Sequence, residues 1–372
     1  MRKGSEQGVI LSYVTEGHNM GIKDGLTWRY DLYVKPYLLL HGSPAMAVVR
    51  KYNNYVLMRH DSPICYIYAD AINIGDKTSS LGVNYLTGRR GVELFSSPAG
   101  LGATFRSLKW LEKNRPDTAI IVGGGGLLQG CFESFWKGLI ATSLRFSLFG
   151  VGANEIQGKR SLPSDEVLRM IVDRASTLHV RDKWTRELLL YHGRGKEISV
   201  GVCPAVNYLV SRYGSTGGGG ERNYLLHVQH PVDIRMAGGN YDLISRKLKK
   251  IAFDLHLHYD ETDHIQEDLD SLVTRYRRAR FVVTSRLHGC IFSYALNTPF
   301  VAMVTDTKTS AFIVTHVPGN PRIGVHSSKE EILRQISLCE GRHSDSQEKY
   351  FQAAIFSNEV AMRKALDVLT TP

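Results

Sequence analysis

Short β-branched segments alternate with amphipathic segments from residue 64 onward, and this alternation constrains the fold more than any other feature of the sequence. A strand followed by a helix, repeated many times, is typical of an open and mostly parallel sheet covered by helices. The chain therefore predicts an α/β fold. The expected strands are residues 64–69, 118–124, 145–151, 177–182, 198–202, 223–230, 253–259, 280–285 and 299–304.

One Gly/Ser-rich segment, SRYGSTGGGGERN at 211–223, interrupts the alternation and divides it into two blocks. Such a segment is the expected linker between domains. We therefore expect two Rossmann-like, doubly wound domains, residues 64–212 and residues 213–372, with the C-terminal helices packed on the second. Residues 1–63 do not follow the alternation and are expected to form an N-terminal extension.

The composition is that of a globular protein, with 43% hydrophobic and 22% charged residues. No stretch approaches the roughly 18 apolar residues of a membrane span, and the first residues lack the apolar run of a signal peptide. We therefore expect a soluble, cytoplasmic protein. Its five cysteines include no C-x-x-C pair, which argues against a zinc ribbon and a disulfide framework.

The formal net charge of +10 predicts an attraction for anions. Basic residues gather at 246–250 (RKLKK) and 275–280 (RYRRAR), where the simplest interpretation is a solvated helix face. No nucleic-acid-binding motif accompanies the charge, so nucleic acid is not an expected partner. A loose contact of these helices with the anionic inner face of the plasma membrane is expected instead.

The most informative motif is TSRLHG at 284–289, where a buried strand ends and a helix begins. Doubly wound sheets bind ligands at the carboxyl ends of their strands, and two facing domains would place these ends on opposite walls of one cleft. Arg286 offers a fork suited to a carboxylate or phosphate, and His288 offers proton transfer near neutral pH. The structural alternative is an arginine paired with an acid and a hydrogen-bonded histidine.

Other strand ends carry polar or glycine-rich motifs. Gly123–Gly126 follows a strand and would suit an anion, but it lacks the pattern of a Walker or dinucleotide loop and also fits a tight turn. Asn73 and Asp76 follow the first strand, where they would face the cleft or cap the next helix. Arg181 ends another strand, beside the expected N-cap Asp182.

A metal site is a competing hypothesis for the segment DLHLHYD. Alternation along a strand would place Asp254, His256, His258 and Asp260 on one face, as in a zinc-dependent hydrolase. The segment falls late in a strand-helix block and lacks the Asp-His that follows in such hydrolases. We expect polar contacts rather than metal here.

Taken in order, these motifs resemble those of the polysaccharide pyruvyltransferase family over roughly residues 64–315. TSRLHG is the strongest of them. The others are Asn73-Ile-Gly-Asp76, Gly123–Gly126, Val180-Arg181-Asp182, Cys203-Pro204, Asn297-x-Pro299 and Asp306-x-Lys308.

The resemblance implies a fold similar to GT-B glycosyltransferases and the transfer of pyruvate from phosphoenolpyruvate to a sugar, as a cyclic ketal. It implies a glycan or lipid-linked oligosaccharide as acceptor, no metal and no cofactor, with Arg286 and His288 as the catalytic residues. The positions implied for phosphoenolpyruvate are Arg181, Gly124, Gly125, Ser285 and Lys308. The positions implied for the sugar acceptor are Asn73, Asp76 and Asp306.

Three alternatives to this function stay open. A nucleotide-sugar glycosyltransferase of the same architecture would bind a sugar nucleotide at the same place, because fold does not fix function. A zinc-dependent hydrolase would use His256 and His258. A protein that binds an anion without catalysis would be stabilised by phosphoenolpyruvate but would form no product.

Overall fold

The structure is a computed structural model that describes most of the chain beyond the N-terminal segment. The expected N-terminal extension, residues 1–63, lies outside the described residues except for its last two. The described residues are 62–69, 73–89, 91–95, 101–156, 161–193, 195–214, 222–265, 267–340 and 345–370.

The first half of the described chain forms a parallel sheet of six strands, in the order β2-β1-β3-β4-β5-β6. Its strands are short and, in the middle of the sheet, buried on both faces, as expected when helices cover both sides. They are β1 (Ile64–Tyr68), β2 (Val92–Phe95), β3 (Ala119–Gly123), β4 (Phe146–Val151), β5 (Leu178–Val180) and β6 (Ile198–Val200).

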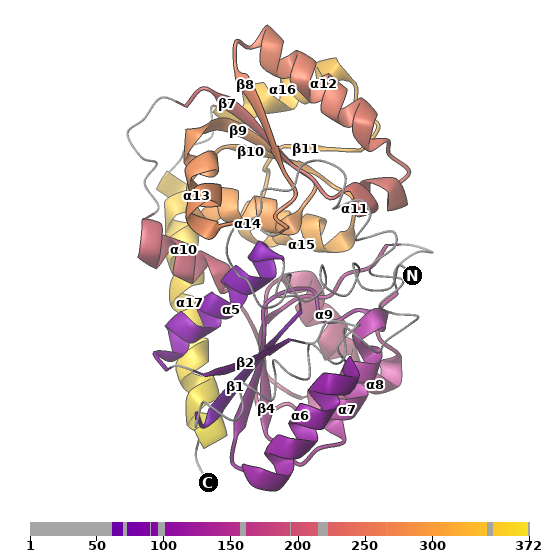
Figure 1. The fold of residues 1–372 in the computed structure, drawn as a ribbon, viewed down its shortest axis with the longest axis vertical. Helices are drawn as coiled ribbons and strands as arrows, with labels where there is room; N and C mark the ends of the chain where they lie inside the picture. Colours follow the sequence, from indigo (N-terminus) through magenta and orange to yellow (C-terminus); the bar gives the residue numbers. More distant parts are fainter. Residues whose placement is uncertain are drawn as a thin grey trace, which may run out of the picture.

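The second half forms a parallel sheet of five strands, in the order β11-β10-β9-β7-β8. The two sheets are stacked along the long axis of the molecule (Figure 1). The strands are β7 (Tyr224–Val228), β8 (His258–Thr262), β9 (Ala279–Thr284), β10 (Phe300–Met303) and β11 (Arg322–Ile323).

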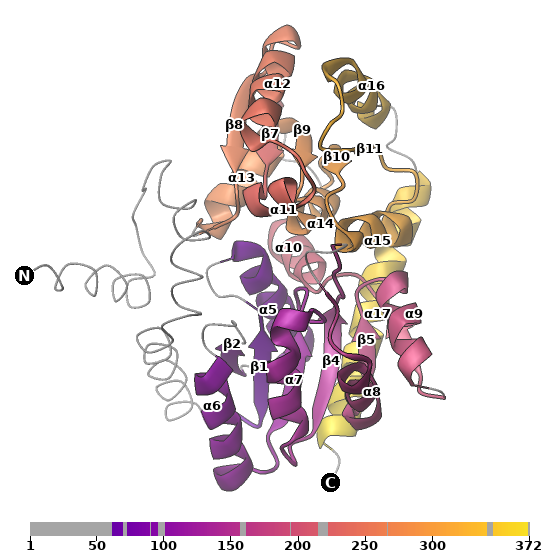
Figure 2. The same ribbon diagram turned by 90° about the vertical axis from the view of Figure 1, so that its right-hand side faces the viewer.

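Helices cover both faces of each sheet (Figures 1 and 2). Those that follow the strands of the first sheet are α5 (Ile74–Thr87), α6 (Leu101–Asn114), α7 (Glu133–Ile140), α8 (Asp165–Arg174), α9 (Lys183–His192) and α10 (Ala205–Tyr213). Those that follow the strands of the second are α11 (Pro231–Met236), α12 (Tyr241–Asp254), α13 (Leu269–Arg278), α14 (Leu287–Ala295), α15 (Thr307–His316), α16 (Lys329–Glu340) and α17 (Asp345–Thr370).

Alternation along each strand divides the core between the two faces. In β7, Leu225 packs in a cluster with α12 and α16, whereas Leu226 packs in a cluster with α10, α13 and α14. In β3, Ile120 faces α6, α7 and α8, whereas Ile121 faces α5 and α17. Both halves are therefore doubly wound, and the predicted class of two Rossmann-like α/β domains is confirmed.

Three helices join the two halves. The start of α5 and most of α10 belong to the same buried cluster as α13, α14 and α15 of the second half. Helix α17 contributes Phe351 to this cluster and Met362 and Leu369 to a cluster on the first sheet. It runs along both domains in Figure 1. The predicted division at residues 212 and 213 stays a prediction, because the segment 215–221 lies outside the described residues.

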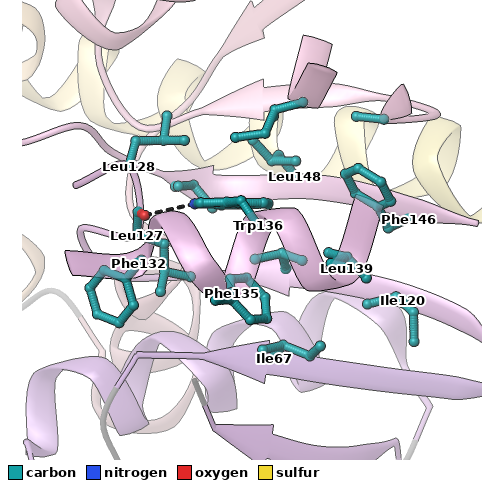
Figure 3. Packing of buried hydrophobic residues seen from close by; sticks show 14 of the residues in the cluster. Ile67, Ile120, Leu127, Leu128, Phe132, Phe135, Trp136, Leu139, Phe146 and Leu148 are labelled. Atoms are coloured by element: carbon teal, nitrogen blue, oxygen red, sulfur yellow. Dashed lines mark hydrogen bonds between the residues drawn. The ribbon is translucent and has the colours of Figure 1, made fainter. Parts of the chain in front are cut away.

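A buried tryptophan fixes the chain just after the glycine-rich turn that follows β3. Trp136 is fully buried on α7, and its Nε1 donates a hydrogen bond to the carbonyl of Leu127 at 2.9 Å (Figure 3). Phe135 and Leu128 pack around the same ring system (Figure 3). The turn is thus attached to a rigid part of the core, which is the requirement for a precise site.

One expected strand was wrongly placed, and two strands were not predicted. The segment 253–259 is not a strand: α12 continues to Asp254, a turn follows in which His256 has a φ of 53°, and β8 begins only at His258. The helical spacing of apolar residues in α12 determines the structure of this segment, rather than the local alternation of histidine and leucine. The strands β2 and β11 were not predicted, because both are short: the first has four residues and the second has two.

Among the described residues, no helix combines the length and the apolar character that crossing a membrane requires.

Candidate functional site

The loops that follow the strands of the two sheets meet at the junction between the domains. Ser79 on α5 contacts His288 on α14, and Glu155 after β4 contacts Thr307 at the start of α15. Ile74 at the start of α5 donates to the carbonyl of His264, which follows β8. Most of the residues that the sequence predicts for the site lie in these loops and helix starts.

His288 lies in the first turn of α14 and is only 7% exposed. Its Nε2 lies 3.3 Å from Ser79 Oγ, and its Nδ1 lies 3.9 Å from Asp76 Oδ1. Gly75 leaves room for the ring, because a Cβ at this position would lie 2.2 Å from His288 Cγ. One turn of α5 therefore holds the imidazole from the opposite domain.

The charge state of His288 follows from its surroundings. Burial is the largest cause that lowers the pKa of this imidazole well below its ordinary value of 6.5. The positive charges of Arg181, Arg286 and Lys308 lower the pKa further. The ring is therefore neutral near pH 7 and able to accept a proton.

Arg286 caps the N-terminus of α14 and is held by the adjacent strand end. Its backbone N–H donates to Thr284 Oγ1 at 3.0 Å, and its Nε donates to the carbonyl of Gln229 at 3.0 Å. The Nε bond fixes the side chain at this end of the strand. The neighbouring Ser285 is fully buried, and its Oγ accepts a hydrogen bond from the N–H of His230 at 2.8 Å.

Lys308 contributes a second cation from α15. Its Nζ lies 2.8 Å from Asp306 Oδ2 and 3.3 Å from Asp233 Oδ2. The other oxygen of Asp306 accepts from the N–H of Thr309 and caps α15. In this structure Asp306 positions Lys308, and its expected contact with a sugar hydroxyl stays a prediction.

Arg181 follows β5 and is completely buried. None of its three guanidinium nitrogens has a hydrogen-bond partner among the described residues, and Nε lies 3.7 Å from Asp182 Oδ2. A Cβ at Gly152 would lie 2.0 Å from one terminal nitrogen, so the guanidinium lies directly against the backbone there. Asp182 Oδ1 caps α9 by accepting from Thr185 N, as the sequence predicts.

The glycine-rich turn after β3 packs against the first turns of α5. Gly124 and Gly125 have φ values of 76° and 80°, which glycine adopts without strain. A Cβ on Gly125 would lie 2.7 Å from Asp76 Oδ1, and one on Gly124 would lie 2.3 Å from Ser79 Cβ. The two glycines therefore allow close approach to the residues that hold His288. Asn73, at the N-cap of α5, accepts from the N–H of Gly75 at 3.0 Å.

The sequence did not single out two residues that touch this centre. Ser79 lies in the middle of a helix, and nothing in its spacing points to His288, 209 residues away. His264 is buried with a φ of 62°, and its Nε2 lies 2.9 Å from Tyr276 Oη. Burial, followed by the charge of Arg286, holds the pKa of His264 well below the ordinary range. The signal for His264 was its place after a strand, within TDH.

The four side chains of the competing metal hypothesis do not converge. His256 lies in the turn after α12, Asp254 pairs with Lys329, and Asp260 receives two hydrogen bonds from Arg275. The ring of His258 packs beside that of Tyr224. No group of three or more metal-ligating side chains occurs in the part of the chain that the structure describes. The hydrolase hypothesis is not supported, because only His258 and Asp260 lie on β8, whereas Asp254 ends α12 and His256 lies in the turn between them.

Comparison with solved structures identifies the fold. A UDP-GlcNAc 2-epimerase from Methanocaldococcus jannaschii has a TM-score of 0.51 at 11% identity, covering 81% of this chain and 98% of its own. A UDP-GlcNAc 2-epimerase from Neisseria meningitidis, bound to UDP-GlcNAc, has a TM-score of 0.51 at 9% identity, covering 82% and 99%. The UDP-N-acetylglucosamine 2-epimerase from Rickettsia bellii has a TM-score of 0.52 at 9% identity, covering 82% and 95%.

At these identities the likeness establishes the fold alone. Two facing Rossmann-like domains with charged loops at their junction define a protein of the GT-B class. The sequence pattern of one family then matches residues 35–307, and the chain belongs to the polysaccharide pyruvyl transferase family. It is therefore a transferase, and the resemblance seen in the sequence is confirmed.

The match begins at residue 35, inside the segment expected to be an N-terminal extension. No curated protein matches the sequence.

Proposed function

We propose that this protein transfers pyruvate from phosphoenolpyruvate to two hydroxyls of a sugar, forming a cyclic ketal on a surface polysaccharide or its lipid-linked precursor. One observation carries the proposal: a buried, neutral imidazole, His288, lies in the field of three cations contributed by both domains. Phosphoenolpyruvate carries a carboxylate and a phosphate, so its binding needs several cations. A transferase of the family already requires a glycan acceptor and a pyruvyl donor.

The proposed chemistry balances with one proton-transfer group. The enol C3 gains a proton and becomes the methyl group, while C2 bonds to two sugar oxygens and loses phosphate. Of the two protons released by the sugar hydroxyls, one replaces the proton given to C3 and the other leaves with phosphate. His288 is the group that gives and recovers a proton, a task for an imidazole that holds either state.

The anion itself changes the state of His288. Since the cations at positions 181, 286 and 308 lower the pKa of the free imidazole, a bound anion that neutralises them raises it. Binding of phosphoenolpyruvate thus favours the protonated imidazole, which can donate the proton that C3 needs. Arg286, Arg181 and Lys308 hold the donor in this scheme, with Ser285 and the backbone of Gly124 and Gly125 beside them.

The sugar acceptor occupies the side of α5 in this proposal, where Asn73 and Asp76 follow β1. Asp76 Oδ1 lies 3.9 Å from His288 Nδ1, so a hydroxyl held by this carboxylate would be close to the imidazole. No cofactor is proposed, because the cations supply the charge stabilisation that the departing phosphate needs.

The experiment is direct. The protein is incubated with phosphoenolpyruvate and a panel of glycosides, and the products are examined by mass spectrometry for the mass of an added pyruvyl ketal, with release of phosphate measured in parallel. Activity that persists after dialysis against a strong chelator is expected. Phosphate release without any sugar product, or no reaction with every acceptor tested, argues against the proposal.

A nucleotide-sugar glycosyltransferase is the second candidate, and the GT-B fold favours it, since a structural neighbour binds UDP-GlcNAc. It predicts that UDP-sugars stabilise the protein against heat and that phosphoenolpyruvate does not. The same thermal experiment with both ligands separates the two functions.

We also propose that the enzyme works in the cytoplasm, with a weak electrostatic contact at the inner face of the plasma membrane. The net charge of +10 supports this placement, as does the basic stretch 246–250 on α12 with the exposed Phe253 beside it. Membrane association that survives high salt would contradict an electrostatic contact.

A further inference from the structure

One polar residue beside the proposed donor site has no role in the scheme above. Asn154 lies just after β4 and is completely buried. Neither Nδ2 nor Oδ1 of its amide has a hydrogen-bond partner among the described residues. Burying an amide without partners costs free energy, so such groups are rare, and a bound ligand, water or ion is one way in which their bonding is completed.

The position of Asn154 follows from its neighbours in the chain. Ala153 forms a parallel bridge with Leu128 and belongs to the hydrophobic core. Successive side chains of an extended segment point to opposite faces, so Gly152 and Asn154 share the face opposite Ala153. A Cβ on Gly152 would point at the guanidinium of Arg181 from 2.0 Å, so this face is the one that Arg181 covers.

Two adjacent groups on this face are thus unpartnered. Arg181 is also completely buried, and its guanidinium has no hydrogen-bond partner among the described residues. The positive charge of Arg181 is among the causes that lower the pKa of His288, so the pair lies within electrostatic reach of the imidazole. A guanidinium fork and an amide N–H on one surface are donors suited to an oxyanion.

From this arrangement we infer that Asn154 is a substrate-binding residue, which donates its amide N–H to the oxyanion of phosphoenolpyruvate that Arg181 holds. The inference rests on the proposed function. Phosphoenolpyruvate offers acceptors only, so the partner of Asn154 Oδ1 is a hydroxyl of the acceptor sugar. Asn154 then lies between the two substrates and aligns them.

Entry to this position requires movement of α15. Thr307 Oγ1 accepts from the N–H of Glu155 at 2.8 Å, and His316 Nε2 lies 2.8 Å from the carbonyl of Arg181. These contacts cover Arg181 and Asn154 with the second domain. The ligand reaches them when the domains separate at α15, and the contacts form again over the bound substrates.

The test uses a side chain of nearly the same shape. Asn154→Leu removes both polar atoms without leaving a cavity, and because the native amide is unpartnered the variant is expected to keep or raise the melting temperature. Binding of phosphoenolpyruvate, measured by calorimetry without acceptor, is expected to weaken about tenfold to a hundredfold, the usual effect of a hydrogen bond to a charged group. Asn154→Asp, which places a carboxylate beside Arg181, is expected to weaken it further.

Asn207→Leu is the matched control. Asn207 is also buried, but its Nδ2 donates to Ile355 O and its Oδ1 accepts from Asn358 Nδ2. This variant is expected to lose stability and to keep the affinity for phosphoenolpyruvate. Comparing the two variants distinguishes a buried amide that stabilises the fold, Asn207, from one that is proposed to bind a ligand, Asn154.

The outcomes are distinguishable. If the wild-type protein does not bind phosphoenolpyruvate, the proposed function fails. If the wild type binds it and Asn154→Leu binds it within about twofold, a change too small for one charge-assisted hydrogen bond, the inference about Asn154 is wrong. It is also wrong if Asn154→Leu and Asn154→Ala both fail to fold. An unchanged KM for the sugar in folded Asn154→Leu would overturn the assignment of Oδ1.

Discussion

At the scale of single residues, the proposed chemistry depends on His288, an imidazole that is neutral in the free protein. We predict that His288→Asn folds and binds phosphoenolpyruvate through the cations, while turnover falls by about a hundredfold or more, the contribution of a general acid or base. Steady-state kinetics and calorimetry check this. His227→Asn is the control, because His227 is also buried and its Nδ1 lies 2.9 Å from Tyr259 Oη on β8. If the His288→Asn variant is stable and keeps more than about a tenth of the wild-type turnover, proton transfer belongs to another residue.

Arg286 is predicted to resist replacement even by lysine. Its Nε is occupied by the carbonyl of Gln229 while the terminal nitrogens remain for the ligand, and one ammonium group cannot do both. Arg286→Lys should therefore lower kcat/KM by on the order of a hundredfold, although the charge is kept. Arg334→Lys is the matched control, because Arg334 also uses its fork on an acid, Glu331, but on the surface. Equal activity of the two variants would show that Arg286 acts only as a charge.

The sequence predicted some residues of the site and missed others for a physical reason. Arg286, His288 and Arg181 were predictable as candidates because each follows the end of a strand, and strand ends of a doubly wound sheet converge. Ser79 and Asn154 were not, since a serine inside a helix and an asparagine in a loop have many structural uses. Only the fold shows that one touches His288 and the other lies buried without a partner among the described residues.

At the scale of secondary-structure elements, the first turn of α5 is the part that positions the imidazole. We predict that Gly75→Ala lowers turnover at least tenfold, because the new Cβ would lie 2.2 Å from His288 Cγ and displace the ring, and displacements of about 1 Å are costly in catalysis. Alanine is a better helix former than glycine, so the helix itself should not suffer. Kinetics and thermal unfolding measure the two effects separately.

Gly324→Ala provides the comparison for this helix variant. A Cβ at Gly324 would meet nothing within 4 Å, so activity and melting temperature should both stay near those of the wild type. If Gly75→Ala keeps full turnover, the contact between α5 and the imidazole does not control the reaction.

Strands and helices were predictable where the pattern of apolar residues fitted only one kind of secondary structure. The runs of β3, β4 and β9 were predictable as strands because they are short, mostly apolar and almost completely buried. The alternation of histidine and leucine at 255–258 was misleading, since the apolar spacing that includes Leu248 and Ile251 on α12 reaches this point. The alternation of a strand and the apolar spacing of a helix overlap in this segment, and packing on the sheet favours the helix.

At the scale of the whole molecule, the domain arrangement depends on contacts that no local pattern contains. Helix α17 places Phe351 in the core shared with the second domain and Met362 against the first sheet. Between them, Asn358 accepts from or donates to three groups of the first domain, including His179 and Asn207. The sequence assigned the C-terminal helices to the second domain. That α17 also packs on the first sheet follows only from the assembled structure.

The charges of the molecule as a whole include several histidines that fold in a neutral form. Burial lowers the pKa of His179 to about 4 and that of His227 to about 4. Burial also lowers the pKa of His316, and it holds the pKa values of His264 and His288 well below the ordinary value. In the unfolded chain all five would titrate near 6.5.

This difference predicts that the protein loses stability as the pH falls from about 7 to about 5.5. In that range the unfolded chain binds protons that the folded protein does not, so each neutral histidine lowers the free energy of unfolding by up to about 1.4 kcal/mol per pH unit. The raised pKa values of the buried Glu93 and Glu267 act in the opposite sense, because the folded protein binds protons there before the unfolded chain does. Urea unfolding at several pH values should therefore show a falling midpoint, and His227→Asn should reduce the slope by about one proton. Because the two glutamates can mask a fall in the midpoint, the decisive result is the slope of His227→Asn. A slope equal to that of the wild type would mean that His227 is not neutral in the folded protein and would contradict the same inference for His288.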